Sequence, residues 1–203
     1  MPLFIAFEGG ERCGKSTQAN LLFKRLSTAG YPAHLVYEPG STPVGEKLRR
    51  LLKSEAMYPE TELLLFAAAR AELVRAVIRP ALEQGEIVIT DRYTDSTLAY
   101  QGYGRGLNRK SIQAITAFAT EGLKPELVIL LDLPVLLGLA RKGNPKDRFE
   151  SEALAFHKRV RQGYLKLARA EPERWLVVDA ALSKARVSKL IWEKASSLLA
   201  GQQ

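Results

Sequence analysis

The sequence is poor in the residues that build disulfides and metal centres. Its 203 residues include one cysteine and two histidines, so no disulfide can form within the chain. His34 and His157 lie far apart and have no acidic or cysteine neighbours at ligand spacing, so we expect structural or surface roles for both. No apolar run reaches the ~18 residues that a membrane span needs, and no basic region leads into a signal sequence. These absences predict a cytoplasmic protein without a membrane partner.

The composition is that of an ordinary globular protein with an excess of positive charge. Hydrophobic residues make up 46% of the chain and charged residues 26%, and the net charge is +8. This length suits one α/β domain, and we expect a single domain over residues 1–203. The positive charge attracts polyanions of any kind. Because no nucleic-acid module and no interleaving of basic and aromatic residues is present, we expect no specific nucleic-acid partner.

The hydrophobic pattern alternates between strands and helices. Several of the expected strands are continuously apolar, which is typical of parallel strands covered on both faces. The alternation predicts a doubly wound, parallel five-stranded sheet of the α/β class. A proline at position 80 predicts a kink near residues 76–79 of a long helical run. The expected strands are 3–7, 33–38, 86–90, 126–131 and 175–178, and the expected helices are 16–26, 43–53, 60–84, 95–101, 109–121, 133–141, 151–170 and 183–200.

Acidic residues follow each of the five expected strands, at the point where the strand ends. They are Glu8, Glu38, Asp91, Asp132 and Asp179. Ligands of open α/β sheets bind outside the carboxyl ends of the strands. We therefore expect these side chains to line one functional edge of the sheet, although charged residues also end strands without any such role.

The stretch between the first strand and the first helix, Gly-Gly-Glu-Arg-Cys-Gly-Lys-Ser, matches the phosphate-loop pattern G-x-x-x-x-G-K-[ST]. In such a loop, backbone N–H groups surround a phosphate and the helix dipole favours the anion. Lys15 is expected to reach the β- and γ-phosphates, and Ser16 to ligate Mg²⁺. The motif therefore predicts a site for a nucleoside triphosphate and its Mg²⁺. The loop and the position after it are Gly9, Gly10, Glu11, Arg12, Cys13, Gly14, Lys15, Ser16 and Thr17.

Four further stretches narrow this prediction. Residues 91–106 (DRYTDSTLAYQGYGRG), 38–49 (EPGSTPVGEKLR), 64–70 (LLFAAAR) and 147–150 (DRFE) resemble, in order, motifs of the thymidylate kinase family. With the phosphate loop, the resemblance covers most of the chain. It implies the P-loop nucleoside monophosphate kinase fold, a homodimer and Mg²⁺. It also implies transfer of the γ-phosphoryl group of ATP to dTMP, giving dTDP and ADP for dTTP and DNA precursor synthesis.

The resemblance also implies an acceptor site. Phe66 and Arg70 are four residues apart, so they share a helix face, where the ring offers a base a flat surface and the guanidinium can donate to thymine O4. Spacing alone would equally suit a core phenylalanine beside a surface arginine. Ser96 and Tyr100 have the same spacing and are expected at the base and at the sugar. The expected acceptor-binding residues are Glu11, Glu38, Pro39, Arg49, Phe66, Arg70, Arg92, Ser96, Tyr100 and Gln101.

Phosphoryl transfer needs charge neutralisation and positioning more than covalent chemistry. By resemblance, Arg49 and Arg92 hold the acceptor phosphate, because a guanidinium fork meets two oxygens at once. Asp91 is expected to position Mg²⁺ through water or to orient the acceptor phosphate, and Glu11 to contact the 3′-hydroxyl of the acceptor sugar. The expected catalytic residues are Arg12, Lys15, Asp91 and Arg92.

A polar segment punctuated by glycine and proline, residues 141–150, resembles the lid that closes over ATP, although a solvated surface loop would look the same. Closure would exclude water and prevent wasteful hydrolysis of ATP. Arg141 is expected to stack on adenine. The expected lid residues are Arg141, Lys146, Arg148 and Glu150.

Three positions depart from what the family usually shows. The family keeps its catalytic arginine either in the phosphate loop or in the lid; here Arg12 stands in the loop while the lid is also basic, and we favour Arg12. Tyr37 and Ser41 replace a common arginine and glycine beside Glu-Pro-Gly, which either weakens phosphate binding or shifts that loop.

Cys13, near a helix N-terminus, predicts inactivation by thiol reagents and protection by ATP, although simple packing of a small residue explains it as well.

Other functions also fit parts of the sequence. A related kinase could use another nucleotide or the nucleoside thymidine, but the expected pair Arg49 and Arg92 favours an acceptor that already carries a phosphate. A nucleotide-dependent nucleic-acid-binding protein would use the positive charge. A GTPase-like switch is disfavoured because the guanine signature Asn-Lys-x-Asp is absent.

Overall fold

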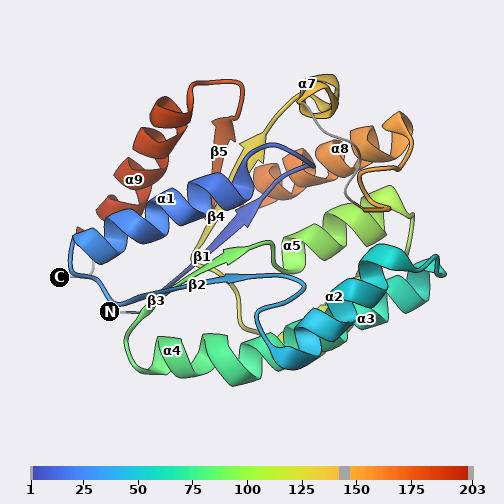
Figure 1. The fold of residues 1–203 in the computed structure, drawn as a ribbon, viewed down its shortest axis with the longest axis horizontal. Helices are drawn as coiled ribbons and strands as arrows, with labels where there is room; N and C mark the ends of the chain where they lie inside the picture. The colour runs from blue at the N-terminus through green and yellow to red at the C-terminus, as the bar shows by residue number, and fades with distance from the viewer. Residues whose placement is uncertain (1, 142–146, 201–203) are drawn as a thin grey trace.

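The computed structural model describes residues 2–141 and 147–200, and these form a sheet covered on both faces by helices (Figure 1). Five parallel strands lie in the order β2-β3-β1-β4-β5. The predicted doubly wound, five-stranded parallel sheet is therefore confirmed. The strands are β1 (Leu3–Glu8), β2 (Ala33–Tyr37), β3 (Ile87–Asp91), β4 (Leu127–Asp132) and β5 (Trp175–Asp179).

The central strand β1 is buried along its whole length, as its continuous apolar sequence predicts. In the sheet register, Phe7 lies beside Asp91 of β3, and Glu8 lies beside Leu130 of β4. The carboxyl ends of the strands therefore meet at one edge, and the segment after β1 emerges in the middle of it. The order of strands changes direction at β1, which is the place where doubly wound sheets bind their ligands.

Two separate hydrophobic clusters hold helices to the two faces of the sheet. Helices α1 (Lys15–Thr28) and α9 (Lys184–Ala200) cover one face, side by side in Figure 1. The opposite face is covered by α3, α4, the π-helical segments η1 and η2, and α8. The remaining bounds are α2 (Pro43–Ser54), α3 (Pro59–Leu73), η1 (Val74–Ile78), α4 (Arg79–Glu83), α5 (Thr94–Thr97), η2 (Leu98–Gly104), α6 (Arg109–Thr120), α7 (Val135–Ala140) and α8 (Leu154–Ala170).

The irregularity predicted for the long helical run before Pro80 takes the form of a π turn. Segment η1 separates α3 from α4, and the N–H of Arg79 donates to the carbonyl of Val74, five residues back. A proline has no N–H and its ring crowds the carbonyl four residues earlier. The wider turn accommodates both effects and lets the helical path continue through α4.

Among the described residues, no helix combines the length and the apolar character that a bilayer crossing demands. Of the expected lid, Lys146 lies outside the described residues, together with positions 142–145.

Candidate active site

The phosphate loop connects β1 to α1 through a tight turn that needs glycine at its first position. Gly9 has φ +140°, and a Cβ placed there would lie 2.6 Å from the carbonyl oxygen of Leu131. Gly14, at φ 98°, precedes the first turn of α1. The ammonium group of Lys15 is nearly buried and donates to the carbonyls of Gly9 at 3.2 Å and Gly10 at 2.8 Å. The loop and the N-terminus of α1 thus form the anion-binding turn that the motif predicts.

A hydroxyl and a carboxylate face each other beside this loop. Ser16 Oγ donates to Asp91 Oδ2 at 2.5 Å, joining the start of α1 to the end of β3. These oxygen ligands suit Mg²⁺, which is commonly held by one or two protein groups together with substrate phosphates and water. Within residues 2–141 and 147–200, no group of three or more histidine, cysteine or acidic side chains could hold a metal.

A cavity of about 660 Å³ opens beside the phosphate loop at the carboxyl edge of the sheet. It brings together all ten residues predicted to bind the acceptor. Arg12, Lys15, Ser16, Thr17 and Asp91 line the same cavity, whereas Gly9, Gly10, Cys13 and Arg141 do not. Its lining residues from the acceptor set are Glu11, Glu38, Pro39, Arg49, Phe66, Arg70, Arg92, Ser96, Tyr100 and Gln101.

Arg92 lies at the centre of the cavity wall in a strained backbone conformation, with φ +76°. Its guanidinium donates to Glu11 Oε1 at 2.7 Å, to the hydroxyl of Tyr100 at 3.0 Å and to the carbonyl of Gly9 at 3.2 Å. Burial alone would raise the pKa of Glu11, but the charges of Arg92 and Lys15 outweigh it and lower that pKa to about 2. Glu11 is therefore a permanent anion that holds Arg92 against the phosphate loop.

Arg70 is fully buried, so the alternative of a surface arginine beside a core phenylalanine is wrong. Its guanidinium pairs with Glu38 at 2.7 Å and donates to Thr97 Oγ1 and the carbonyl of Tyr93, both at 3.0 Å. Burial raises the pKa of Glu38 even though Arg70 lowers it. Phe66, one turn earlier on α3, borders the same cavity.

Three further acceptor residues, Ser96, Tyr100 and Gln101, line the cavity, but their polar atoms bind protein partners. Ser96 Oγ donates to Glu8 Oε2 at 2.6 Å, and Gln101 Nε2 donates to Glu62 at 2.6 Å. The hydroxyl of Tyr100 donates to Glu11 at 2.5 Å. The expected contact between Ser96 and the base stays a prediction, and the structure adds a buried carboxylate behind this serine.

Tyr37 and Ser41, which depart from the usual family pattern, build a brace around Arg49. The guanidinium of Arg49 lies 5.0 Å from the centre of the Tyr37 ring and donates to the carbonyl of Pro39 at 2.8 Å, next to the cis Glu38–Pro39 peptide. The Tyr37 hydroxyl and the Ser41 N–H both donate to Glu46. Tyr37 therefore supplies a stacking surface for Arg49 where an arginine would supply a second charge.

The described part of the expected lid contacts the phosphate loop directly. Arg12 pairs with Glu150 at 2.8 Å and donates to the carbonyl of Arg141 at 2.8 Å. The guanidinium of Arg141 donates to the carbonyls of Arg12 at 3.0 Å and Ala180 at 2.8 Å. Arg148 pairs with the buried Glu62 at 2.6 Å. These contacts place both candidate arginines, Arg12 and Arg141, at the junction between loop and lid.

Some expectations about the sheet edge do not hold. Asp132 forms a bidentate pair with Arg161 at 2.7 and 2.8 Å, and Asp179 caps the N–H of Ala181; neither borders the cavity. Cys13 is only 3% exposed and packs in the hydrophobic core, with Lys15 Nζ 3.7 Å from its sulfur, so burial restricts the access of a thiol reagent and the predicted inactivation stays a prediction.

Other important residues were missed. Tyr164 is buried on α8, and Glu62 and Thr97 are buried too; the sequence carries no signal for these three residues beyond their place in expected helices.

The strand order, the phosphate loop after β1 and the cavity beside it define a P-loop kinase of the nucleoside monophosphate kinase class. A sequence model of the family described as thymidylate kinase matches residues 7–191. The chain belongs to the thymidylate kinase family.

Relatives and a solved structure agree with this assignment. The thymidylate kinase of Dehalococcoides mccartyi strain 195 is 51% identical over 203 residues, with 98% of both chains covered. That of Deinococcus radiodurans is 50% identical, with 96% of both chains covered. A crystal structure of thymidylate kinase from Ehrlichia chaffeensis superposes with a TM-score of 0.75 at 34% identity, covering 87% of this chain and 92% of that one.

Proposed function

We propose that this protein transfers the γ-phosphoryl group of ATP to dTMP, giving dTDP and ADP for dTTP and DNA precursor synthesis. The observation that carries the proposal is the single cavity in which the phosphate loop, a stacking phenylalanine and several arginines converge. One end of the cavity can hold the phosphates of ATP, and the other end can hold the base of the acceptor. The phosphate of the acceptor then lies between these two ends. Family membership supports the choice of thymine as that base.

The acceptor end of the cavity has a group for each part of dTMP. The ring of Phe66 offers a stacking surface for thymine, and Arg70, held by Glu38, keeps one further N–H donor, on Nη1, for thymine O4. Arg49 and Arg92 hold the 5′-phosphate. Because these two cations would have no partner on a nucleoside, the site favours dTMP over thymidine as the acceptor.

The donor end supplies charge neutralisation. Lys15 now rests on loop carbonyls and would exchange them for phosphate oxygens, while Arg12 stabilises charge that develops on the transferred group. Ser16 and Asp91 would hold Mg²⁺, Asp91 through water. When bound, the metal supplies positive charge at the phosphate oxygens. Glu11 orients Arg92 and borders the sugar pocket, where it can reach the 3′-hydroxyl.

Within the single domain 1–203, residues 141–150 serve as the lid over ATP, and Arg141 lies against adenine. Closure brings Glu150 to Arg12 and Arg148 to Glu62, the contacts observed here. Water is then excluded from the transferred phosphoryl group. We place the protein in the cytoplasm.

An assay of ADP release with ATP and Mg²⁺ tests the proposed reaction. dTMP, dUMP, thymidine, AMP, CMP and GMP are offered in parallel. Strong turnover with dTMP, weaker turnover with dUMP and none with thymidine are expected. Turnover with thymidine, or with none of the six, would mean that the acceptor residues have been assigned wrongly.

A pair of variants tests which arginine serves the transition state. Arg12→Gly is expected to lower kcat by on the order of 10²–10³, because it removes a positioned charge from the reacting phosphoryl group. Arg141→Ala should mainly raise KM for ATP. Near-normal turnover by Arg12→Gly would transfer the catalytic role to the lid.

We also propose a homodimer formed through α3 and α6. These helices pack against each other, and each carries a large exposed apolar side chain, Leu64 at 56% and Phe118 at 89% exposure. A second copy of the same surface would bury both. Phe118→Glu should shift the mass measured by light scattering from dimer to monomer; a monomeric native protein would refute the proposal.

A further inference from the structure

Glu8, the last residue of β1, lies behind the acceptor site with no exposed surface and no role in the reaction described above. Its Oε1 accepts hydrogen bonds from the backbone N–H groups of Tyr93 at 2.9 Å and Ser96 at 3.1 Å. Its Oε2 accepts from Ser96 Oγ at 2.6 Å and from the hydroxyl of Tyr164 at 2.8 Å. The start of α5, with the residue before it, and α8 thus converge on the carboxylate at the end of β1.

The two hydroxyls that bind Glu8 are also the partners of Arg92. Arg92 Nη1 lies 3.2 Å from Ser96 Oγ and 3.3 Å from the Tyr164 hydroxyl. A hydroxyl has one proton to donate and two lone pairs that accept. When both protons point at the carboxylate of Glu8, the lone pairs are left for the guanidinium. The two hydroxyls also lie 2.8 Å from each other, and the ionised carboxylate is the acceptor that draws both protons away from this contact.

We propose that Glu8 is a positioning residue that acts on Arg92 through Ser96 and Tyr164, so that the guanidinium is held in the orientation that receives the acceptor phosphate. The inference rests on the proposed function, in which Arg92 binds that phosphate. It also gives Ser96 a role different from the predicted contact with the base.

The electrostatics around Glu8 show that these hydrogen bonds favour its ionised form against the effect of burial. Burial, followed by the neighbouring charge of Asp95, raises the pKa of Glu8 to about 7, while Ser96, Arg92 and Tyr164 lower it. A carboxylate so deeply buried would be neutral near pH 7 without such partners. The groups that favour its charge are the same ones that connect it to Arg92.

The substitution Glu8→Gln tests this proposal because it preserves the shape of the side chain and replaces one hydrogen-bond acceptor, Oε2, by a donor. The amide oxygen can keep both backbone N–H donors, so the amide nitrogen takes the place of Oε2. An NH₂ group donates, so both hydroxyls must accept from it and turn their protons elsewhere. A proton turned toward Arg92 Nη1 opposes the guanidinium instead of holding it.

The measurement compares an acceptor with and without its phosphate. The Kd for dTMP, by calorimetry, is expected to rise about 10- to 100-fold in Glu8→Gln, the effect of losing hydrogen bonds to a charged group. The inhibition constant of thymidine, which has no phosphate for Arg92, should change less than about twofold. A rise of the same size for both ligands, or for neither, would overturn the proposal.

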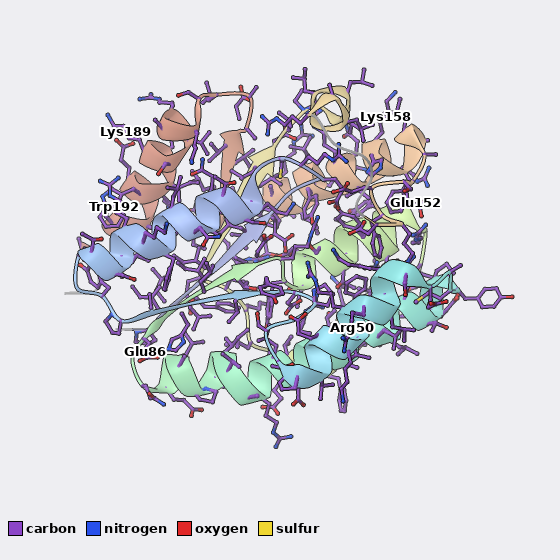
Figure 2. All side chains as sticks on the ribbon, in the orientation of Figure 1. Arg50, Glu86, Glu152, Lys158, Lys189 and Trp192 are labelled. Atoms are coloured by element: carbon purple, nitrogen blue, oxygen red, sulfur yellow. The ribbon has the colours of Figure 1, made fainter. Side chains whose placement is uncertain are left out.

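Matched variants separate this effect from general damage. Glu86→Gln makes the same change at the opposite edge of the sheet (Figure 2), where Glu86 pairs with His34, and should leave both ligands unaffected. Ser96→Ala and Tyr164→Phe each remove one of the two connections and should weaken dTMP selectively; Tyr103→Phe is the control for the tyrosine. If Glu8→Gln fails to fold, Ser96→Ala and Tyr164→Phe still test whether Arg92 is positioned through these two hydroxyls.

The proposed function is judged separately, on the unaltered protein. Turnover of dTMP by the native enzyme tests the reaction, whereas the dTMP-to-thymidine ratio among the variants tests Glu8. When Glu8→Gln is combined with Ser96→Ala, the losses should be smaller than additive, because both act through one connection. Full additivity would contradict a shared path to Arg92.

Discussion

The stability of this protein should depend on pH through Glu8, and Glu8→Gln should reveal how much. The pKa of Glu8 is raised from 4.5 to about 7, with burial as the largest cause. The folded state therefore binds a proton more tightly than the unfolded chain does between these two values. Stability due to this group is complete below about pH 4.5 and declines as pH rises through about 7.

The magnitude follows from the difference between the two pKa values. One pKa unit corresponds to about 1.4 kcal/mol, so the interval from 4.5 to about 7 gives a loss of about 3 kcal/mol once Glu8 is ionised. Glutamine resembles the protonated acid in size and charge. The variant should therefore be about as stable as the native protein near pH 5 and about 3 kcal/mol more stable above about pH 8.

Urea unfolding of both proteins from about pH 5 to pH 9 measures this difference directly. Buried acids that do not interact with Glu8 affect both proteins alike, so the difference reports Glu8 together with its coupling to Asp95. In a chain of this size the gain corresponds to roughly 6–12 °C in Tm. If the variant is less stable than the native protein at high pH, the carboxylate contributes net stability and the reasoning is refuted.

Three further changes test the cavity wall and the phosphate loop. Tyr37→Leu should raise KM for dTMP about two- to fivefold by removing the surface on which Arg49 stacks, and Tyr37→Phe should raise it less; equal effects would point to the hydroxyl instead. Cys13 should react with a thiol reagent far more slowly in the native protein than in urea, and equal rates would contradict its burial. Arg70→Met should cost about 3–5 kcal/mol in urea unfolding because Glu38 is left buried and unpaired, whereas a loss below about 1 kcal/mol would contradict the pairing.

The parts of the molecule that sequence predicts well are those where local geometry demands one residue type. Gly9 must approach the carbonyl of Leu131, and continuous apolar runs can only be covered strands, so the loop and the sheet could be located in advance. The cavity followed, because parallel strands bring their carboxyl ends to one edge.

Partners from distant segments could not be predicted in the same way. Tyr164 reaches Glu8 across 156 positions, and its helix reads as amphipathic whether its tyrosine serves a core or a site. Asp132 and Asp179 show the opposite error, because an acid at the end of a strand can form an ion pair or accept from a backbone N–H as readily as serve a site. The spacing of residues along one helix or strand predicts which face they share. It does not predict which side chain of another helix or strand contacts that face.

The arginines of the cavity carry a further lesson about the net charge of +8. Three of them are paired with carboxylates: Arg92 with Glu11, Arg70 with Glu38 and Arg12 with Glu150. A guanidinium that is paired with a carboxylate attracts phosphates in general less strongly, because the carboxylate offsets its positive charge. It offers its remaining N–H groups in a fixed direction, so an anion gains full interaction only when its geometry matches. The pairing therefore lowers the affinity of the cavity for phosphates in general and raises its selectivity for a phosphate with the matching geometry. Glu8 extends this arrangement by one layer, since it holds Arg92 through the hydroxyls of Ser96 and Tyr164.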